Sequence, residues 1–148
     1  MFLKIPPPIF VVIALLAMYG CKLFLPLWQF KTFWIIAIPL IIITVTIGFL
    51  SILALAKADT TISPFTPEKT ARLVTRGIYQ YSRNPMYLSL LLLLIAAVFI
   101  SGALSSVFVV IAFVLVVNHY QIKPEEKALM YLFGDEYRYY CLHVRRWL

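Results

Sequence analysis

The sequence predicts an all-α integral membrane protein with about four transmembrane helices, a cytoplasmic loop and an amphipathic helical C-terminal tail. Of the 148 residues, 63% are hydrophobic and only 13% are charged, whereas roughly a quarter of the residues of a soluble domain are charged. The mean hydropathy is +0.93. Because the length suits one domain, we expect residues 1–148 to form a single membrane domain.

Four apolar segments are predicted to span the bilayer: residues 8–25, 33–56, 86–101 and 103–120. Lys22 interrupts the first segment, the second carries no charge, and the third is short for the roughly 20 residues that a spanning helix needs. Ser101-Gly102 is a tight-turn signal, so the last two segments are predicted to form a helical hairpin. The first segment lacks a small-residue cleavage site, so we do not expect a removed targeting peptide.

The positive charges predict the orientation. Of the 13 Lys and Arg residues, ten lie in two segments, residues 57–87 and 121–148, and only Lys31 lies between the first two spans. The positive-inside rule therefore places both termini and the middle loop in the cytoplasm, with the spans in the inner membrane. The bilayer is the expected partner, and anionic headgroups rather than nucleic acid explain the net charge of +7.

The middle loop carries two helix-start signals. Thr66-Pro67-Glu68 predicts a short interfacial helix that runs to about Thr75 and stops at Gly77. Asn84-Pro85 predicts the start of the third span, with Asn84 as its cap. The positive end of that helix would lie beside Arg83, which favours a carboxylate or phosphate ligand. A capped helix without a ligand is the simpler alternative.

The tail is a second polar block. The fourth span is expected to end at Asn118-His119-Tyr120-Gln121, and Pro124 predicts the start of a new helix with Glu125 and Glu126 in its first turn. Gly134 is expected to stop or bend that helix, and an amphipathic stretch follows. Three aromatic residues of this stretch are interpreted as anchors at the membrane interface: Tyr137, Tyr140 and Trp147.

His119 has two interpretations, a hydrogen-bonded packing residue or a catalytic base, and the sequence leaves both open. Cys21 lies in a span and Cys141 in the tail, so a disulfide between them is not expected. No Cys and His residues have the spacing of a metal site, and no metal is predicted.

The ordered set of polar motifs resembles one superfamily. The motifs are Leu73-Val74-Thr75-x-Gly77-x-Tyr79, Arg83-Asn84-Pro85-Met86-Tyr87, Glu125-Glu126-x-x-Leu129, Phe133-Gly134-x-x-Tyr137-x-x-Tyr140 and Val144-x-Arg146-Trp147. At these spacings the chain resembles a bacterial-type member of the isoprenylcysteine carboxyl methyltransferase and phospholipid methyltransferase superfamily. The resemblance covers about half of the chain, from Ala71 to Leu148.

This resemblance implies a methyltransferase that uses S-adenosylmethionine, bound at the cytoplasmic ends of the helices beneath the C-terminal segment. The implied cofactor contacts are Arg72, Leu73, Val74, Tyr79, Asn84, Pro85, Met86, Tyr87 and Glu125. The chemistry of the residues agrees. The helix start beside Arg83 suits the cofactor's carboxylate, and Glu125 or Glu126 suits its amine and ribose hydroxyls. Arg83 and His119 are the candidate catalytic residues.

Three positions depart from the pattern of the superfamily. Asn84 stands where the eukaryotic enzymes usually carry His, and Arg145 replaces the proline of a Val-Pro-Arg ending. Gln121 occupies the position of a substrate-binding Arg, which makes it the candidate substrate-binding residue here and leaves two acceptors open, prenylcysteine and another amphiphile. A carboxylate or thiolate acceptor needs no general base, whereas an amine or hydroxyl would use His119 as the nearest candidate.

Two other functions remain open from the sequence. Membrane reductases that use NADPH share a similar C-terminal pattern, although they are much longer. A non-catalytic membrane scaffold would use its apolar spans as the binding surface and would not depend on Asn84 or Glu125. Binding of S-adenosylmethionine or of NADPH separates these alternatives.

Overall fold

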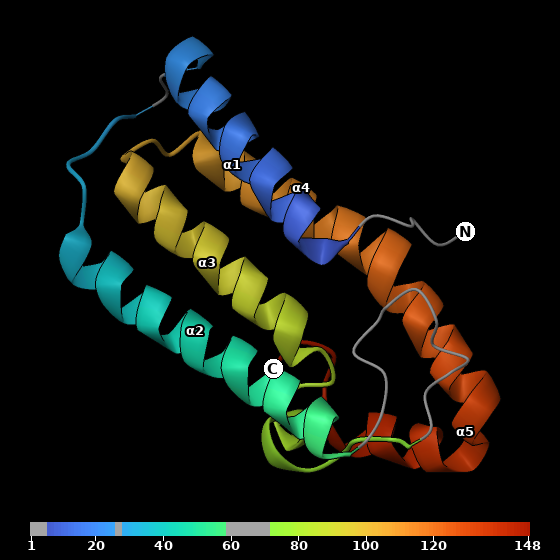
Figure 1. The fold of residues 1–148 in the computed structure, drawn as a ribbon. Helices are drawn as coiled ribbons and strands as arrows, with labels where there is room; N and C mark the ends of the chain where they lie inside the picture. The colour runs from blue at the N-terminus through green and yellow to red at the C-terminus, as the bar shows by residue number, and fades with distance from the viewer. Residues whose placement is uncertain (1–5, 26–27, 59–71) are drawn as a thin grey trace.

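The computed structural model describes residues 6–25, 28–58 and 72–148, and its regular structure is helical. The elements are α1 (Pro7–Phe24), α2 (Trp34–Lys57), the 3₁₀ turn η2 (Gly77–Gln80), α3 (Pro85–Ser101), α4 (Ser106–Val117), the π-helical turn η3 (Asn118–Ile122) and α5 (Lys123–His143). Figure 1 shows α1 to α4 side by side, with α5 continuing from α4 beyond the bundle. The predicted all-α fold is confirmed.

The helices have the length and composition of a membrane protein. Within the described residues, α1, α2 and the continuous helix Ser106–His143 are long and apolar enough to cross a bilayer, and α3 is a shorter apolar helix. The helices α1, α2 and α3 match the predicted segments within one residue at each end, and the continuous helix contains residues 106–120 of the fourth. In the continuous helix the first charge is Lys123, so we take the membrane-spanning part to end at about Tyr120. Large apolar side chains such as Phe24 and Ile35, each 83% exposed, face outward as lipid contacts do.

α3 is the central helix of the bundle. It packs against α1, α2 and α4, as Figure 1 shows. The buried residues of α2 have small side chains. They are Ala37, Thr44 and Ser51, which follow one another at intervals of seven residues. Small side chains let two helix backbones approach closely in a membrane. On the other side, Met18 of α1, Leu94 of α3 and the α4 residues Phe113 and Val117 share one apolar core.

The two loops at the far end of the bundle pair with each other. The N–H of Phe30 donates to the carbonyl of Gly102 at 2.8 Å, and Gln29 forms an isolated β-bridge with Ala103. Gly102 has φ +67°, and a Cβ there would lie 2.3 Å from the Phe30 carbonyl oxygen. Only glycine fits such a position. The predicted tight turn and helical hairpin are therefore confirmed.

The prediction of an interfacial helix from Thr66 to Thr75 is wrong for residues 72–75, the part that the structure describes. Its start at Thr66-Pro67-Glu68 lies outside the described residues, and residues 72–75 are not helical. Gly77, with φ +65°, begins η2 instead of ending a helix. The non-helical backbone lets Leu73 pack against Tyr137, Tyr140 and Val144. Burial of that side chain outweighs the weak helix signals of the loop.

The start predicted at Pro124 is confirmed in part, because α5 begins at Lys123 with proline in its first turn. The helix is not a new one, because α4, η3 and α5 are continuous. The N–H of Lys123 donates to the carbonyl of Asn118, five residues back. This wider π turn precedes Pro124, whose missing N–H and ring would otherwise disturb the helix. The break comes at Gly134, with φ 50° and ψ −120°, as predicted.

After Gly134 the chain folds back, and this reversal changes the role of the tyrosines. Tyr137 and Tyr140 are 2% and 6% exposed and form a buried cluster with Val144, and Trp147 packs against the main core. The interpretation of Tyr137 and Tyr140 as interface anchors is wrong, because the folded-back helix turns its tyrosine face onto the protein. Trp147 is half-buried, and its role at the interface stays a prediction. Tyr131 and Tyr139, 90% and 66% exposed, are the outward-facing aromatic residues of α5.

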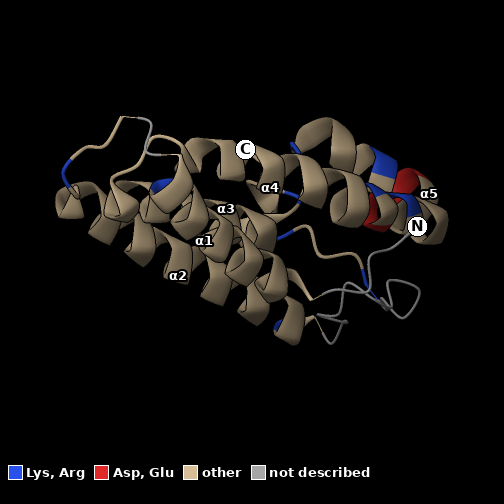
Figure 2. Cartoon of the chain, turned by 90° about the horizontal axis from the view of Figure 1, so that it is seen from above, with Lys and Arg blue, Asp and Glu red and all other residues tan. Residues whose placement is uncertain are grey.

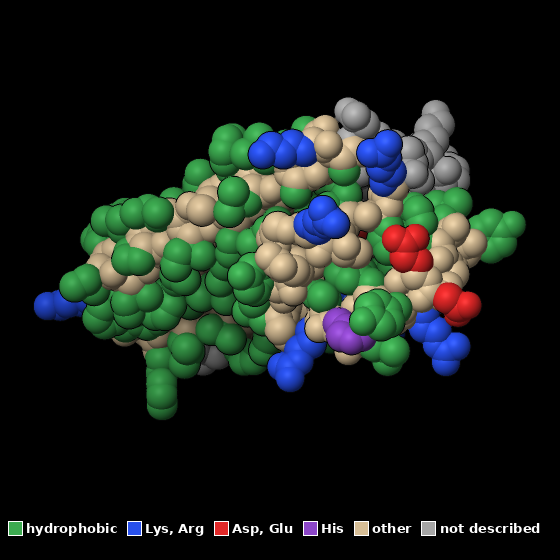
Figure 3. Space-filling model, turned by 90° about the horizontal axis from the view of Figure 1, so that it is seen from below, with side chains coloured by type: hydrophobic (Ala, Val, Ile, Leu, Met, Phe, Trp, Pro, Cys, Tyr) green, Lys and Arg blue, Asp and Glu red, His purple; other side chains and the backbone are tan. Residues whose placement is uncertain are grey.

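Charged residues gather at one end of the molecule. Figure 2 shows Lys, Arg, Asp and Glu concentrated around α5, while α1 to α4 are mostly uncharged. In Figure 3 the same division appears on the face seen from below, where one end is mostly hydrophobic and the other carries most of the charges. The polar residues singled out in the sequence lie at that charged end.

Candidate functional site

The site lies where four segments meet: η2, the start of α3, the start of α5 and the C-terminal strap, which we define as residues 144–148. We call the side chains of Tyr79, Asn84, Tyr87, Glu125 and Glu126 the polar corner. They come from two blocks some 40 residues apart in sequence, joined by the α3–α4 hairpin. The hairpin thus brings the two polar blocks together, as the resemblance implied.

Tyr87 and Glu125 form one half of the polar corner. Tyr87 lies in the first turn of α3, and its hydroxyl donates to Glu125 Oε1 at 2.6 Å. Burial of the carboxyl group raises the pKa of Glu125 to about 7, and the neighbouring Glu126 adds to that rise, while the Tyr87 hydrogen bond opposes it. Among the described residues, no Lys or Arg forms an ion pair with Glu125.

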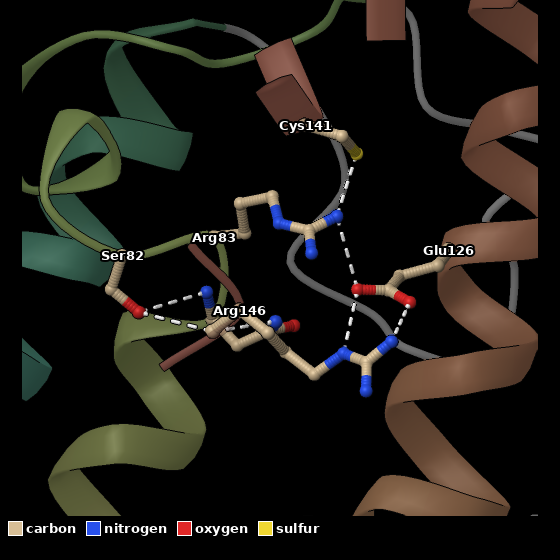
Figure 4. A network of polar contacts seen from close by, with 6 residues as sticks. Ser82, Arg83, Glu126, Cys141 and Arg146 are labelled. Carbon is tan, nitrogen blue, oxygen red and sulfur yellow. Dashed lines mark hydrogen bonds and ion pairs between the residues drawn. The ribbon is translucent and has the colours of Figure 1, made fainter. Parts of the chain in front are cut away.

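Glu126 has the opposite surroundings, because two arginines neutralise it. Arg146 donates to it twice, from Nε at 2.9 Å and from Nη2 at 2.7 Å. Arg83 Nη1 lies 3.2 Å from Glu126 Oε1 and donates to Cys141 Sγ at 2.6 Å. Figure 4 shows this network between the start of α3, α5 and the strap. Bidentate arginine pairing is strong and directional, so Glu126 holds the strap in place.

Asn84 also holds the strap. Its Nδ2 donates to the Arg146 carbonyl at 3.0 Å, and its backbone N–H donates to Ser82 Oγ at 3.1 Å. The Ser82 hydroxyl donates to the same Arg146 carbonyl at 3.4 Å, and the N–H of Arg83 donates to the Arg145 carbonyl. In the described structure Asn84 makes no side-chain capping bond to α3. The predicted cap is therefore wrong in its chemistry, because the side chain binds the strap instead.

Tyr79 closes the polar corner from the side of η2. The residue is buried, and its backbone carbonyl accepts a hydrogen bond from the hydroxyl of Tyr140. Burial raises the pKa of the Tyr79 phenol, with smaller contributions from Tyr140 and Glu125. Tyr79 is thus a neutral hydroxyl near the Glu125 carboxyl.

The other residues carried over from the resemblance differ in burial. Pro85 is buried in the first turn of α3, Met86 beside it is half-buried, Leu73 and Val74 are half-buried next to η2, and Arg72 is exposed. Gln121 is 0% exposed within η3, so the described structure leaves it no open surface on which to meet a substrate.

His119 lies outside the polar corner. It is exposed on η3, where its ring makes an edge contact with Tyr120 at 4.7 Å between ring centroids. It lines an open groove of about 500 Å³, together with Leu115, Val116, Asn118, Tyr120, Lys123 and Arg146. Arg146 is the residue that this groove shares with the network around Glu126.

Sequence reasoning missed the residues that fix the strap. The sequence patterns indicate no role for Ser82, Cys141 or the Arg146 guanidinium. They favour ligands as partners of Arg83 and Glu126, whereas in the structure these two residues pair with each other. The Val144-x-Arg146-Trp147 motif marked the strap. Its pairing with Glu126, 20 residues away, had no local signal.

Comparison with known proteins identifies a family. The family model described as phospholipid methyltransferase matches residues 32–136. The chain belongs to the phospholipid methyltransferase family. The resemblance stated from the motifs is therefore confirmed, and the chain is a member of a family of membrane methyltransferases.

The chain is also similar to a bacterial protein. An uncharacterized protein from Haemophilus influenzae is 52% identical over 63 residues, which is 43% of this chain and 100% of that protein. No solved structure matches the chain. The region that matches the phospholipid methyltransferase model includes η2, α3 and both glutamates, whereas the C-terminal strap lies beyond it.

Proposed function

We propose that the chain is an S-adenosylmethionine-dependent methyltransferase that acts on a lipid-like acceptor at the cytoplasmic face of the membrane. The observation that carries the proposal is the contrast between the two adjacent glutamates. Glu126 is neutralised by Arg83 and Arg146, whereas the half-buried Glu125 has a tyrosine hydroxyl as its partner. A carboxylate that is partly removed from water and has no cation beside it is an unfavourable arrangement that a cationic ligand relieves.

The groups of the polar corner fit the cofactor's chemistry. Glu125 would bind the cofactor's ammonium group, and the Tyr87 hydroxyl fixes the orientation of that carboxyl. The first-turn N–H groups of α3, starting with Met86, would bind the cofactor's carboxylate at the positive end of the helix. Leu73, Val74 and buried Tyr79 offer an apolar and aromatic wall for the adenine.

The bound cofactor would supply an activated methyl group. The residues of the chain would therefore mainly position the cofactor and the acceptor and exclude water from them. The strap is held to the start of α3 by Asn84 and to α5 by Glu126, and in this position it would keep water from the polar corner. Arg83, once a candidate for catalysis, holds Glu126 and Cys141 and is proposed to position the strap. This division leaves Glu125 as the acid that meets the ligand.

The acceptor would reach the methyl group from the bilayer. A carboxylate or thiolate acceptor requires no base. For an amine or hydroxyl acceptor, His119 remains the candidate base, although it lies in the groove rather than in the polar corner. Gln121 would act on the substrate indirectly, through the shape of η3. Family membership favours this methyltransferase over the NADPH-linked reductase and over a non-catalytic scaffold.

Calorimetry of the purified protein in detergent tests the proposal. We expect S-adenosylmethionine to bind and NADPH not to bind. Glu125→Gln should weaken binding by about 1–3 kcal/mol, the usual loss when a charged hydrogen-bond partner is removed. Glu136→Gln, which removes an exposed carboxylate from the same helix, is the matched control. Tight NADPH binding, or equal cofactor affinity in the parent and Glu125→Gln, would contradict the proposal.

A further inference from the structure

Apart from His119, the groove beside that residue has a lining that the proposed methyl transfer does not use. It lies where the spanning helix passes through η3 into the charged start of α5. None of the residues of the polar corner lines it. Its ligand can therefore be argued from its own walls, independently of the cofactor.

One wall of the groove is apolar and belongs to the membrane-spanning helix. Leu115 is 64% exposed and Val116 is half-buried, both in α4. Tyr120, 40% exposed, follows at the level where the apolar span ends. Tyrosine at that depth is typical of the boundary between acyl chains and headgroups. The groove thus runs from the acyl-chain region up to the headgroup region.

The other wall is cationic. Lys123 and Arg146 line the groove, and no carboxylate is among its lining residues. Lys123 is exposed. Glu126 uses the Nε and one Nη2 donor of Arg146, and an arginine has five N–H donors. Arg146 can therefore hold Glu126 and an anionic ligand in the groove at the same time.

Asn118 carries a hydrogen-bond acceptor that a ligand with a donor group would satisfy. It lines the groove, and its Oδ1 is buried without a hydrogen-bond partner within residues 6–25, 28–58 and 72–148. A buried acceptor without a partner is costly. Phosphate oxygens cannot satisfy it, but a ligand hydroxyl can, once the half-buried Asn118 side chain rotates to present Oδ1 to the groove. The lining therefore suits a ligand with a hydroxyl, an anionic group and an apolar chain.

We propose that this groove binds the headgroup of an anionic, hydroxylated phospholipid of the bilayer. Its phosphate would lie between Lys123 and Arg146, its hydroxyl would donate to Asn118 Oδ1, and an acyl chain would follow Leu115 and Val116. The charge of the lining selects an anionic headgroup over a zwitterionic one. The site stands whether or not the chain transfers methyl groups.

The test is calorimetric titration of the full chain in non-ionic detergent, without cofactor, using dihexanoyl lipids. Phosphatidylglycerol should bind roughly tenfold more tightly than phosphatidylcholine. Lys123→Gln should weaken phosphatidylglycerol binding by about fivefold, the effect of one interfacial lysine, and Lys123→Arg should retain it. Lys127→Gln removes an exposed lysine from the same helix, outside the groove, and should bind as the parent does.

Further arms test the hydroxyl and the lipid source. Phosphatidylmethanol is anionic but lacks a headgroup hydroxyl, so it should bind to the parent more weakly than phosphatidylglycerol does. The Asn118→Ala variant should bind the two lipids with equal affinity. Glycerol 3-phosphate should bind more weakly than either lipid. Equal affinity for phosphatidylglycerol and phosphatidylcholine, equal losses in Lys123→Gln and Lys127→Gln, or equal affinity for glycerol 3-phosphate and the lipid would overturn the proposal.

Discussion

At the scale of single residues, the two glutamates at the start of α5 differ in what surrounds them. Glu126 accepts three contacts from two guanidinium groups, and Glu125 accepts one from a tyrosine hydroxyl. Both lie in the first helical turn, where the helix dipole gives each only about 0.3–1 kcal/mol. The dipole therefore does not separate them. The difference comes from the strap, which delivers Arg146 to one carboxylate and not to the other.

The raised pKa of Glu125 predicts a stability that falls with pH in the protein without ligand. The folded-state pKa is about 7, against 4.5 for the ordinary carboxyl. Its contribution is therefore fully present below pH 4.5 and is lost as the pH rises through 7. The loss amounts to about 3 kcal/mol. Chemical denaturation in detergent at pH 5 and pH 8.5 measures it.

Glu125→Gln should remove this dependence, because the amide does not titrate and can still accept the Tyr87 hydrogen bond. At pH 8.5 the variant should be more stable than the parent, while at pH 5 the two should be similar. Glu136→Gln should follow the parent at both pH values, since the side chain of Glu136 is exposed. A pH profile of the parent that Glu125→Gln leaves unchanged would show that another group is responsible.

At the scale of elements, the C-terminal strap is held by the segment that precedes α3. Asn84-Pro85 predicted the start of that helix correctly, because proline at the first position is a local signal. The sequence did not predict what the Asn84 side chain binds. A capping bond is local, whereas its bond to Arg146 spans 62 residues and exists only because the tail folds back at Gly134.

Asn84→Asp tests the strap. Asp caps helices as well as Asn does, so a capping role predicts an unchanged melting temperature. The structure predicts a loss of about 1–3 kcal/mol, because a carboxylate would face the Arg146 carbonyl without a donor. Hydrogen exchange in residues 144–148 should also accelerate.

Gln80→Glu is the matched control for that substitution. It adds the same charge at an exposed position of η2 and should leave the melting temperature and the exchange of the strap unchanged. If Asn84→Asp matched this control in both measurements, Asn84 would not hold the strap.

The reversal at Gly134 depends on glycine. With φ 50° and ψ −120° it has a backbone that other residues rarely adopt, and an added Cβ would meet nothing within 4 Å. Gly134→Ala should therefore cost about 1–3 kcal/mol of stability through backbone strain alone. Gly20→Ala places the same methyl group in equally open space in α1, at an ordinary helical position, and should be neutral or stabilising. Equal unfolding free energies for the two variants would contradict the strained turn.

At the scale of the whole molecule, the positions of the helices were predictable and the folding of the tail was not. The long apolar segments and the Ser101-Gly102 turn gave α1 to α4 within a few residues. Pro124 suggested a break, because the π turn that accommodates it leaves no clear mark in the sequence. Tyr137 and Tyr140 suggested the membrane interface, because the partners that bury them, such as Leu73, lie far away in sequence.

The orientation in the membrane remains a prediction at this scale. The loop between α1 and α2 and the α3–α4 turn lie together, and the charge distribution places them opposite the cytoplasm. Cys21→Ala and Cys141→Ser first remove the native cysteines. Arg76→Cys or Leu104→Cys then introduces a single cysteine at an exposed position. An impermeant maleimide on intact cells should label only the Leu104→Cys protein. Labelling of both from outside would contradict this orientation.

Methyl transfer itself is the most direct test of the account. The chain in lipid nanodiscs is incubated with S-adenosylmethionine carrying a tritiated methyl group, and the label in the organic extract is counted. The parent and Glu136→Gln should transfer label to the lipid fraction, and Glu125→Gln should lose roughly tenfold or more of that transfer. Label no higher than with heat-inactivated protein, or equal transfer by Glu125→Gln and the parent, would contradict the central claim.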